Sequence, residues 1–306
     1  MADPDPSSPE VVEFSPAFSG LQGKPANLVR NRLLIAGAAA AVVAIAIVAT
    51  FEWIKPVAAP PAGAAAATRI SPALARLIAQ VTGVPVRTSD AAGDGGGLVT
   101  ARPIPVSGPP LAVNGKPEIF YYGTEYCPYC ATQSWAMIVA LSRFGTFTGI
   151  RAIRSADYQP DPYLATWAFY GSAYTSKYLS FVPVETRSDV LISRTANPQS
   201  MKSYTELQKL TAAQQAIVSR YDKARGVPFL DFGNKYVLVG SSFLPMVLER
   251  QTWSQIAATL TNARNMTGPA ILGTANYITA AICGLTGDQP ASACTPTVRS
   301  LLGPGT

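Results

Sequence analysis

The sequence predicts an α/β domain preceded by one transmembrane helix. Three observations lead to this prediction. Strand-like runs alternate with helix-like segments from residue 111 onward, two cysteines (Cys127 and Cys130) lie between a strand and a helix, and residues 33–51 carry no charge. Hydrophobic residues make up 48% of the 306 residues and charged ones 14%, which is enough apolar material for a sizeable core.

The absence of histidine excludes several classes of enzyme. Without an imidazole the chain cannot form a Ser-His-Asp triad, a Cys-His protease dyad or a histidine-ligated zinc site. The net charge is +6, but the Lys and Arg residues are scattered singly, so we expect no nucleic-acid partner. The chemistry must therefore come from cysteine, carboxylate, tyrosine, lysine or the backbone.

Residues 33–51, LLIAGAAAAVVAIAIVATF, are predicted to span a membrane and contact its lipid. A helix of this length extends about 28 Å, close to the hydrocarbon thickness of a bilayer. A cleavable secretory signal is the alternative, but the polar leader of residues 1–32 and the long apolar run favour an uncleaved anchor. We expect residues 1–32 to be disordered, because they are polar and without periodicity.

The charges that flank the apolar segment predict its orientation. Three basic residues precede it and one follows closely: Lys24, Arg30, Arg32 and Lys55. We therefore expect a single-pass protein of the cell membrane, with a cytoplasmic N-terminus and an extracytoplasmic main domain. Such compartments are oxidising, so disulfides can persist there. A Pro/Ala-rich linker, residues 52–69, would lead to the domain at residues 70–306.

Turn residues and periodicity predict the order of elements within that domain. They indicate a helix at 71–82 capped by Ser71, strands at 111–113 and 118–122 joined by Asn114-Gly115, a helix at 128–144, a strand at 149–155, a hairpin or loop-and-strand insertion at 163–192, a helix at 203–223, a second hairpin of 228–232 and 235–240, and helices near 252–263 and 270–284. Ser203 and Glu206 have the spacing of a capping box for the helix at 203–223.

Cys127 and Cys130 have the spacing of a redox pair. The strand that ends at Tyr122 and the loop after it place Cys127 at the start of the next helix, where free N–H groups and the helix dipole favour a thiolate. Pro128 suits the first helical turn, where its missing donor is not needed. Cys130 lies on the same face, within bridging distance. We predict an accessible attacking thiolate with a resolving partner beside it.

Two other interpretations of this pair are less favoured. A metal site would need two further ligands, and although Cys283 and Cys294 could supply them, their ten-residue gap is not a zinc-knuckle spacing. A purely structural disulfide would close a four-residue loop and stabilise very little. We therefore favour the redox interpretation and expect neither a metal nor a tightly bound cofactor.

Cys283 and Cys294 favour a structural disulfide. The first ends an apolar helix and the second follows the polar loop TGDQPASA. A bridge across this loop would stabilise the fold by about 3 kcal/mol in the chain-entropy model. A second redox pair that exchanges electrons with the first is the alternative.

The order of strand, Cys-x-x-Cys, helix, strand, insertion, Gly-Val-Pro, hairpin and helix resembles the thioredoxin superfamily. Residues 127–130 (CPYC) and 226–229 (GVPF) carry the resemblance. It implies a thioredoxin-like fold with an insertion between the active-site helix and a cis-proline hairpin. It also implies a substrate groove beside the cysteines, bordered by Val227, Pro228, Pro128 and Tyr129.

Two positions depart from the superfamily pattern. Many thioredoxins carry a buried acid six residues before the first active cysteine, and this position is Tyr121 here. Glu118 and Glu125 lie nearby, but neither clearly replaces that acid. Oxidases of the disulfide-forming branch often have histidine between the cysteines, whereas Pro128-Tyr129 is familiar from glutaredoxins and disfavours a very strong oxidant.

Longer stretches resemble an uncharacterised membrane-anchored thioredoxin-like family, catalogued as a domain of unknown function and found in archaea and actinobacteria. The likeness covers roughly residues 70–300 and is carried by NGKPEIFYYGTEYCPYC, ALSRFGTF, SAYTSKYLSFVPVE and the AN…IC…C tail. Within it, YTSKYLSFVPVE either packs in the core or at an edge strand, which we favour, or shapes a substrate groove beside the cysteines.

Together these features predict a membrane-anchored thiol-disulfide oxidoreductase that acts on protein thiols or disulfides. Cys127 would attack, Cys130 would resolve the mixed disulfide, and a redox partner in the membrane would recycle the pair. Two alternatives stay open. One is a non-catalytic thioredoxin-like docking module of a membrane complex. The other is delivery of a soft metal such as Cu(I), against which the lack of nearby His and Met ligands counts.

Overall fold

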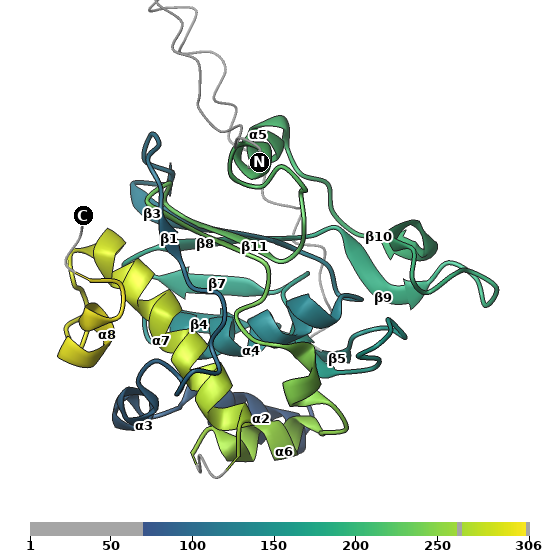
Figure 1. The fold of residues 1–306 in the computed structure, drawn as a ribbon, viewed down its shortest axis with the longest axis horizontal. Helices are drawn as coiled ribbons and strands as arrows, with labels where there is room; N and C mark the ends of the chain where they lie inside the picture. The colour runs from purple at the N-terminus through teal and green to yellow at the C-terminus, as the bar shows by residue number, and fades with distance from the viewer. Residues whose placement is uncertain (1–69, 262–264, 304–306) are drawn as a thin grey trace, which may run out of the picture. The chain divides into compact units, whose positions relative to one another are not determined.

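The computed structural model describes residues 70–261 and 265–303, which are drawn in colour in Figure 1. By internal contacts the chain divides into Met1–Thr68 and Arg69–Thr306, and every feature described below belongs to the second unit. The predictions of a disordered leader, a membrane span and a linker concern residues 1–32, 33–51 and 52–69, which lie outside the described residues.

The described residues form a mixed α/β structure with seven α-helices and twelve strands. The helices are α2 (Pro72–Thr82), α3 (Val86–Ala92), α4 (Pro128–Leu141), α5 (Ala212–Tyr221), α6 (Trp253–Thr259), α7 (Thr267–Thr286) and α8 (Pro296–Ser300), with 3-10 turns η1 (Met201–Ser203) and η2 (Pro245–Leu248). The strands are β1 (Ile104–Pro105), β2 (Ala112–Val113), β3 (Lys116–Gly123), β4 (Gly145–Thr148), β5 (Arg151–Arg154), β6 (Ala165–Ala168), β7 (Ala173–Ser176), β8 (Ser180–Glu185), β9 (Arg187–Leu191), β10 (Tyr204–Glu206), β11 (Phe229–Phe232) and β12 (Tyr236–Val239).

A six-stranded mixed sheet organises the domain (Figure 1). Its strands follow the order β1-β12-β11-β3, and β8 pairs with the other edge of β3, whose first residues also pair with β2. Strand β8 is parallel to β3, with Glu185 opposite Gly123, whereas β11 is antiparallel to it, with Phe229 opposite Tyr122. A parallel neighbour needs a crossover connection, and α4 forms part of it.

Strand β3 is buried on both faces because helices cover both sides of the sheet. Successive side chains point to opposite faces. Ile119 and Tyr121 belong to the larger core cluster, to which α4 and α7 contribute, while Phe120 and Tyr122 belong to a smaller one with Val218 of α5. Figure 1 shows α4 and α7 on one side of the sheet and α5 on the other. The carboxyl end of β3 is therefore held from both sides.

Both predicted hairpins are present. Strands β2 and β3 are joined by Asn114 and Gly115, with φ of 51° and 73°. The connection between β11 and β12 contains Gly233 and Asn234, with φ of 63° and 57°. Glycine and asparagine adopt positive φ more readily than other residues, which explains why these dipeptides mark the turns.

Several predicted helices and one strand also agree with the structure. Helix α2 begins after Ser71, whose hydroxyl accepts a hydrogen bond from the Leu74 N–H at 3.2 Å. Helix α4 begins at Pro128 as expected and ends three residues earlier. Strand β5 lies within the predicted strand at 149–155, and α6 and α7 correspond to the last two predicted helices.

The predicted helix at 203–223 is wrong in its first half. Helix α5 is preceded by a capping box of Thr211 and Gln214, eight residues after the one predicted from Ser203–Glu206. Residues 204–206 instead form β10, which pairs antiparallel with β9. Tyr204 provides the reason, because its fully buried ring makes tertiary contacts that override the local pattern.

The segment 163–192 contributes more strands to the fold than the predicted hairpin or loop-and-strand insertion would. It contains β6, β7, β8 and β9, and β8 is the parallel neighbour of β3 in the main sheet. The other strands form the two-stranded pairs β4–β7, β5–β6 and β9–β10. Phe181 packs against the larger core and Val184 against the smaller one, so the favoured interpretation of YTSKYLSFVPVE as core packing is correct.

Among the described residues, one helix has the length and composition of a membrane span. This helix is α7, and 83% of its apolar window is buried inside the protein. It packs against α3, α4 and α8, which identifies it as a core helix. It is a different segment from the span predicted near the N-terminus.

Candidate active site

Cys127 lies at the N-cap of α4, four residues after β3 ends. Its backbone is extended, with φ −79° and ψ 126°, and its carbonyl accepts the first helical hydrogen bond from the Ala131 N–H at 3.0 Å. The N–H groups of Tyr129 and Cys130 point at the Cys127 sulfur. The helix N-terminus therefore surrounds this sulfur with donors, as predicted.

Both sulfurs are largely enclosed, which corrects the prediction of an accessible thiolate. Cys127 is 7% and Cys130 3% exposed, and both thiols are free. The cover is aromatic, because Tyr126 and Tyr204 pack in one cluster with the pair. Tyr129, between the two cysteines, is by contrast 41% exposed. Of the two cysteines, Cys127 keeps the slightly larger exposed fraction.

The two thiols have opposite pKa shifts. The pKa of Cys127 is lowered, chiefly because the Cys130 thiol donates a hydrogen bond to its sulfur, while burial opposes this effect. The pKa of Cys130 is raised well above its usual value by burial, and its contact with Cys127 adds to the shift. Cys127 is therefore the better nucleophile, and Cys130 holds its proton.

The downstream proline motif lies beside the cysteines. The Val227–Pro228 peptide bond is cis, as the resemblance implied, and Val227 packs in the cluster that contains both cysteines. Within the part of the chain that the structure describes, the N–H and C=O of Val227 have no hydrogen-bond partner. The structure thus brings Val227 to the pair, with a backbone edge free to bond another chain.

Tyr121 and Glu185 extend the site into the protein behind Cys130. The Tyr121 hydroxyl is buried, and burial raises its pKa well above the usual value, with the charges of Cys130 and Glu185 adding. Glu185 accepts hydrogen bonds from the N–H groups of Phe169 and Tyr170, at 2.9 and 2.6 Å. Burial raises the pKa of Glu185 to about 8, so this carboxyl is mostly neutral at pH 7.

Sequence reasoning missed Glu185, because it is distant from the cysteines along the chain. The parallel pairing of β8 with β3 brings Glu185 to the site, because it sets Glu185 opposite Gly123. The two carboxylates that the sequence did single out have other partners. Glu125 forms an ion pair with Arg151, and Glu118 lies near Asp231, where burial raises its pKa to about 7.

Cys283 and Cys294 form a disulfide with a Cα–Cα distance of 5.7 Å, as the structural interpretation expected. The bridge joins the end of α7 to the segment before α8. Asp288 lies close enough to make a three-residue group with metal-ligand spacing. Two sulfurs bonded to each other are not thiolates, so this group is not a metal site while the disulfide is intact.

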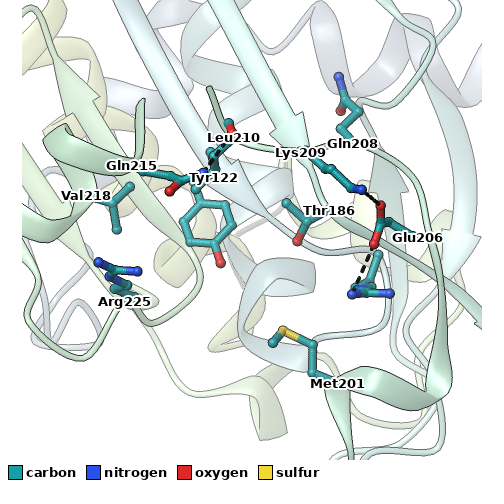
Figure 2. A pocket seen from close by; sticks show the side chains of 11 residues that line it. Tyr122, Thr186, Met201, Glu206, Gln208, Lys209, Leu210, Gln215, Val218 and Arg225 are labelled. Atoms are coloured by element: carbon teal, nitrogen blue, oxygen red, sulfur yellow. Dashed lines mark hydrogen bonds and ion pairs between the residues drawn. The ribbon is translucent and has the colours of Figure 1, made fainter. Parts of the chain in front are cut away.

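A cavity of about 350 Å³ lies beside Tyr122, the penultimate residue of β3 (Figure 2). Tyr122 and Thr186 line it, with Leu210 and Val218 as apolar neighbours, and we call it the Tyr122 pocket. Burial raises the pKa of Tyr122, and the charge of Cys130 adds to the shift, which indicates that its ring lies close to both the pocket and the pair.

The structure thus defines a mixed α/β protein with a cysteine pair at the start of a buried helix. Residues 102–284 match the family described as Domain of unknown function (DUF929), and the chain belongs to this family. The match confirms the expected membership in a domain-of-unknown-function family, and it includes the cysteine pair and Pro228. No curated protein and no solved structure matches the chain.

Proposed function

We propose that this chain is a membrane-anchored thiol-disulfide oxidoreductase with a thioredoxin-like fold, acting on protein cysteines outside the cytoplasm. The observation that carries the proposal is the pair itself. Cys127 has a lowered pKa at a helix N-terminus, and the protonated Cys130 donates to it from one helical turn away. An activated thiol beside a resolving thiol is the arrangement that disulfide exchange requires.

The topology supports the thioredoxin-like part of the proposal. A parallel pair (β3 and β8) stands beside an antiparallel hairpin (β11 and β12), with α4 and α7 on one face and α5 on the other. The order of elements along the chain is the one that the resemblance implies. The segment from β9 to η1 separates β8 from α5 as an additional feature.

The reaction follows from the two sulfurs. The Cys127 thiolate attacks one sulfur of a substrate disulfide, that S–S bond breaks, and the other substrate sulfur leaves as a thiolate. Cys130 then loses its proton, and its sulfur attacks Cys127. The Cys127–Cys130 disulfide forms, the mixed disulfide breaks, and the substrate leaves with two thiols. The substrate gains two electrons that the pair loses, and the reverse sequence oxidises a dithiol substrate.

The backbone of Val227 supports a protein substrate. Its unpaired N–H and C=O lie beside the cysteine cluster, so an extended segment can hydrogen-bond there while its sulfur meets Cys127. Pro128 and the exposed Tyr129 directly follow Cys127, and Pro228 directly follows Val227, so we expect all three to border the same region. A redox partner in the membrane, either a quinone-linked oxidase or a thiol-reducing transporter, completes the cycle.

Anchoring rests on the sequence. Residues 33–51 are uncharged over the length of a bilayer, and the basic residues lie mostly before them. The disulfide between Cys283 and Cys294 supports an oxidising compartment for the domain.

A redox titration of the full-length protein tests the proposal. The protein is equilibrated with defined ratios of reduced and oxidised dithiothreitol and the free thiols are counted by mass spectrometry, with Cys127→Ser as the control. We expect one two-electron transition, absent in the variant, and a Cys130→Ser variant that accumulates mixed disulfides. The reduction potential of the cysteine pair indicates the direction of electron transfer. A value near that of thioredoxin indicates a reductase, and a much higher value indicates an oxidase.

One observation favours the second candidate, a non-catalytic docking module. Both sulfurs are nearly enclosed, at 7% and 3% exposure, and a thiol that no substrate reaches cannot exchange. A pair that never equilibrates with the dithiol in the titration would support this candidate instead.

A further inference from the structure

One residue, Val227, packs both with residues that line the Tyr122 pocket and with the cysteine pair. Val227 packs with Tyr122 and Val218 in the smaller core cluster, and also with Cys127 and Cys130 in the site cluster. A chain that pairs with the Val227 backbone therefore lies close both to the sulfurs and to Tyr122 and Val218, which line the pocket.

Backbone hydrogen bonds fix one wall of the pocket to the loop before Cys127. The Thr186 N–H donates to the Gly123 carbonyl at 3.0 Å, and the Glu125 N–H donates to the Arg187 carbonyl at 2.8 Å. The position of this wall relative to the attacking sulfur is thus set by the main chain rather than by mobile side chains.

More basic than acidic side chains line the Tyr122 pocket. Arg187, Lys209 and Arg225 face a single carboxylate, Glu206. Glu206 already pairs with Arg187 at 3.4 Å and with Lys209 at 2.9 Å, and Figure 2 shows these two contacts on the side away from Arg225. Arg225 is exposed, and within 70–261 and 265–303 its side chain makes no hydrogen bond or ion pair. Within the described part of the chain, one cation at the pocket therefore forms no ion pair.

The remaining lining suits a short side chain with a charged end. Leu210 and Val218 offer apolar surface, while the hydroxyls of Tyr122 and Thr186 are donors. A cavity of about 350 Å³ has room for one such side chain and several waters.

We propose that the Tyr122 pocket binds the carboxylate of an Asp or Glu side chain close to the reacting cysteine of a protein substrate. Arg225 pairs with the carboxylate, and the methylene groups lie over Leu210 and Val218. The inference rests on the proposed function, because it names the substrate class of the same site: proteins with an acidic residue beside an exposed cysteine.

Binding without electron transfer tests this proposal. Fluorescent peptides with serine in place of cysteine are titrated with the full-length protein in detergent micelles, and Asp, Asn or Lys is scanned through the three positions on either side. At one position we expect the Asp peptide to bind about threefold more tightly than the Asn peptide, and the Lys peptide more weakly. The difference should disappear in about 0.5 M salt, because exposed charges are screened.

Variants assign the preference to Arg225. Arg225→Gln is expected to abolish it and Arg225→Lys to retain most of it. Arg76→Gln is the matched control, because Arg76 is an exposed cation on α2, outside the pocket, and its loss changes the net charge equally. A wild-type protein with no Asp preference at any position, or a preference that survives Arg225→Gln, overturns the proposal.

Exchange is measured separately, with uncharged dithiothreitol. If exchange occurs and the Asp preference is absent, the proposal for the pocket fails and the oxidoreductase proposal stands. If no exchange occurs but the preference depends on Arg225, the pocket is a carboxylate site of a docking module and the oxidoreductase proposal fails.

Discussion

Tyr126 and Tyr204 stack face to face, with ring centroids 4.3 Å apart and ring planes 2° from parallel. The contact joins the residue before Cys127 to β10, a strand far along the chain. The Tyr204 hydroxyl donates to the Pro198 carbonyl at 2.6 Å, so its ring is held in place. Exposure of the Cys127 sulfur therefore depends on the segment that carries Tyr204.

Tyr204→Leu is expected to raise the alkylation rate of Cys127 several-fold, because it removes the ring that covers the site. The rate is measured with iodoacetamide and mass spectrometry on the native protein, with Cys127→Ser to assign the signal. Loss of the buried ring should also lower the free energy of unfolding, by about 1–3 kcal/mol. Tyr178→Leu, which removes an aromatic contact with Phe144 away from the site, should leave the rate unchanged.

The Cys130 thiol is expected to control the pKa of Cys127. Cys130→Ala removes the donor that contributes most to the lowered pKa of Cys127, so this pKa should rise. Cys130→Ser keeps a hydroxyl donor and should raise the pKa less. The pH dependence of iodoacetamide alkylation measures the pKa in each variant, and an equal rise in both would contradict this role.

Glu185 is expected to make the protein less stable as pH rises. Its pKa lies at about 8 against a usual value of 4.5, so between these values the folded protein holds a proton that the unfolded chain releases. Such a group stabilises the fold fully only below the unfolded pKa, and stability is lost as pH rises through the folded one. A tenfold difference in proton affinity between the two states corresponds to about 1.4 kcal/mol.

Glu185→Gln should remove this dependence, since its amide oxygen can still accept from the Phe169 and Tyr170 N–H groups. We expect the variant to be more stable than the wild type by several kcal/mol near pH 8, with little difference near pH 4. Urea unfolding at each pH measures the difference in the free energy of unfolding between the variant and the wild type. Glu206→Gln serves as the control and should gain nothing, because ion pairs lower the pKa of Glu206. An equal gain there would contradict the argument.

The disulfide between Cys283 and Cys294 is expected to stabilise the domain without taking part in exchange. Replacing both cysteines with serine should lower the free energy of unfolding by about 3 kcal/mol, as the closed loop implies. The rate of Cys127 exchange with dithiothreitol should stay at the wild-type value when measured below the melting temperature. A slower rate in the folded variant would instead indicate a second redox pair.

The cysteine pair and the two hairpins could be predicted because their signals are local. Asn114-Gly115 and Gly233-Asn234 adopt the positive φ that their residue types favour. Pro128 directly after Cys127 indicates a helix start from neighbouring residues alone. The sequence therefore sufficed to place the cysteine pair at the start of a helix.

The aromatic ring of Tyr204 that covers the cysteines and the buried carboxyl of Glu185 could not be predicted, because long-range strand pairing brings both residues to the site. Nothing near Glu185 indicates that β8 lies parallel to β3, and the run FVPV has no alternation from which to predict a face. Ser203 and Glu206 fit a capping box by spacing, but the burial of Tyr204 outweighs it. Local patterns are weak wherever an aromatic ring finds a deep tertiary contact.

Helix α7 has a consequence for how the molecule is made. It supplies the apolar layer against α4, yet it follows every strand of the sheet along the chain, so the ribosome delivers this layer only after the sheet has been made. Until then the nascent domain presents a bare hydrophobic face that chaperones can bind and that can drive aggregation. A premature stop codon before residue 267 should therefore yield a product destined for proteolysis rather than a shortened but working protein.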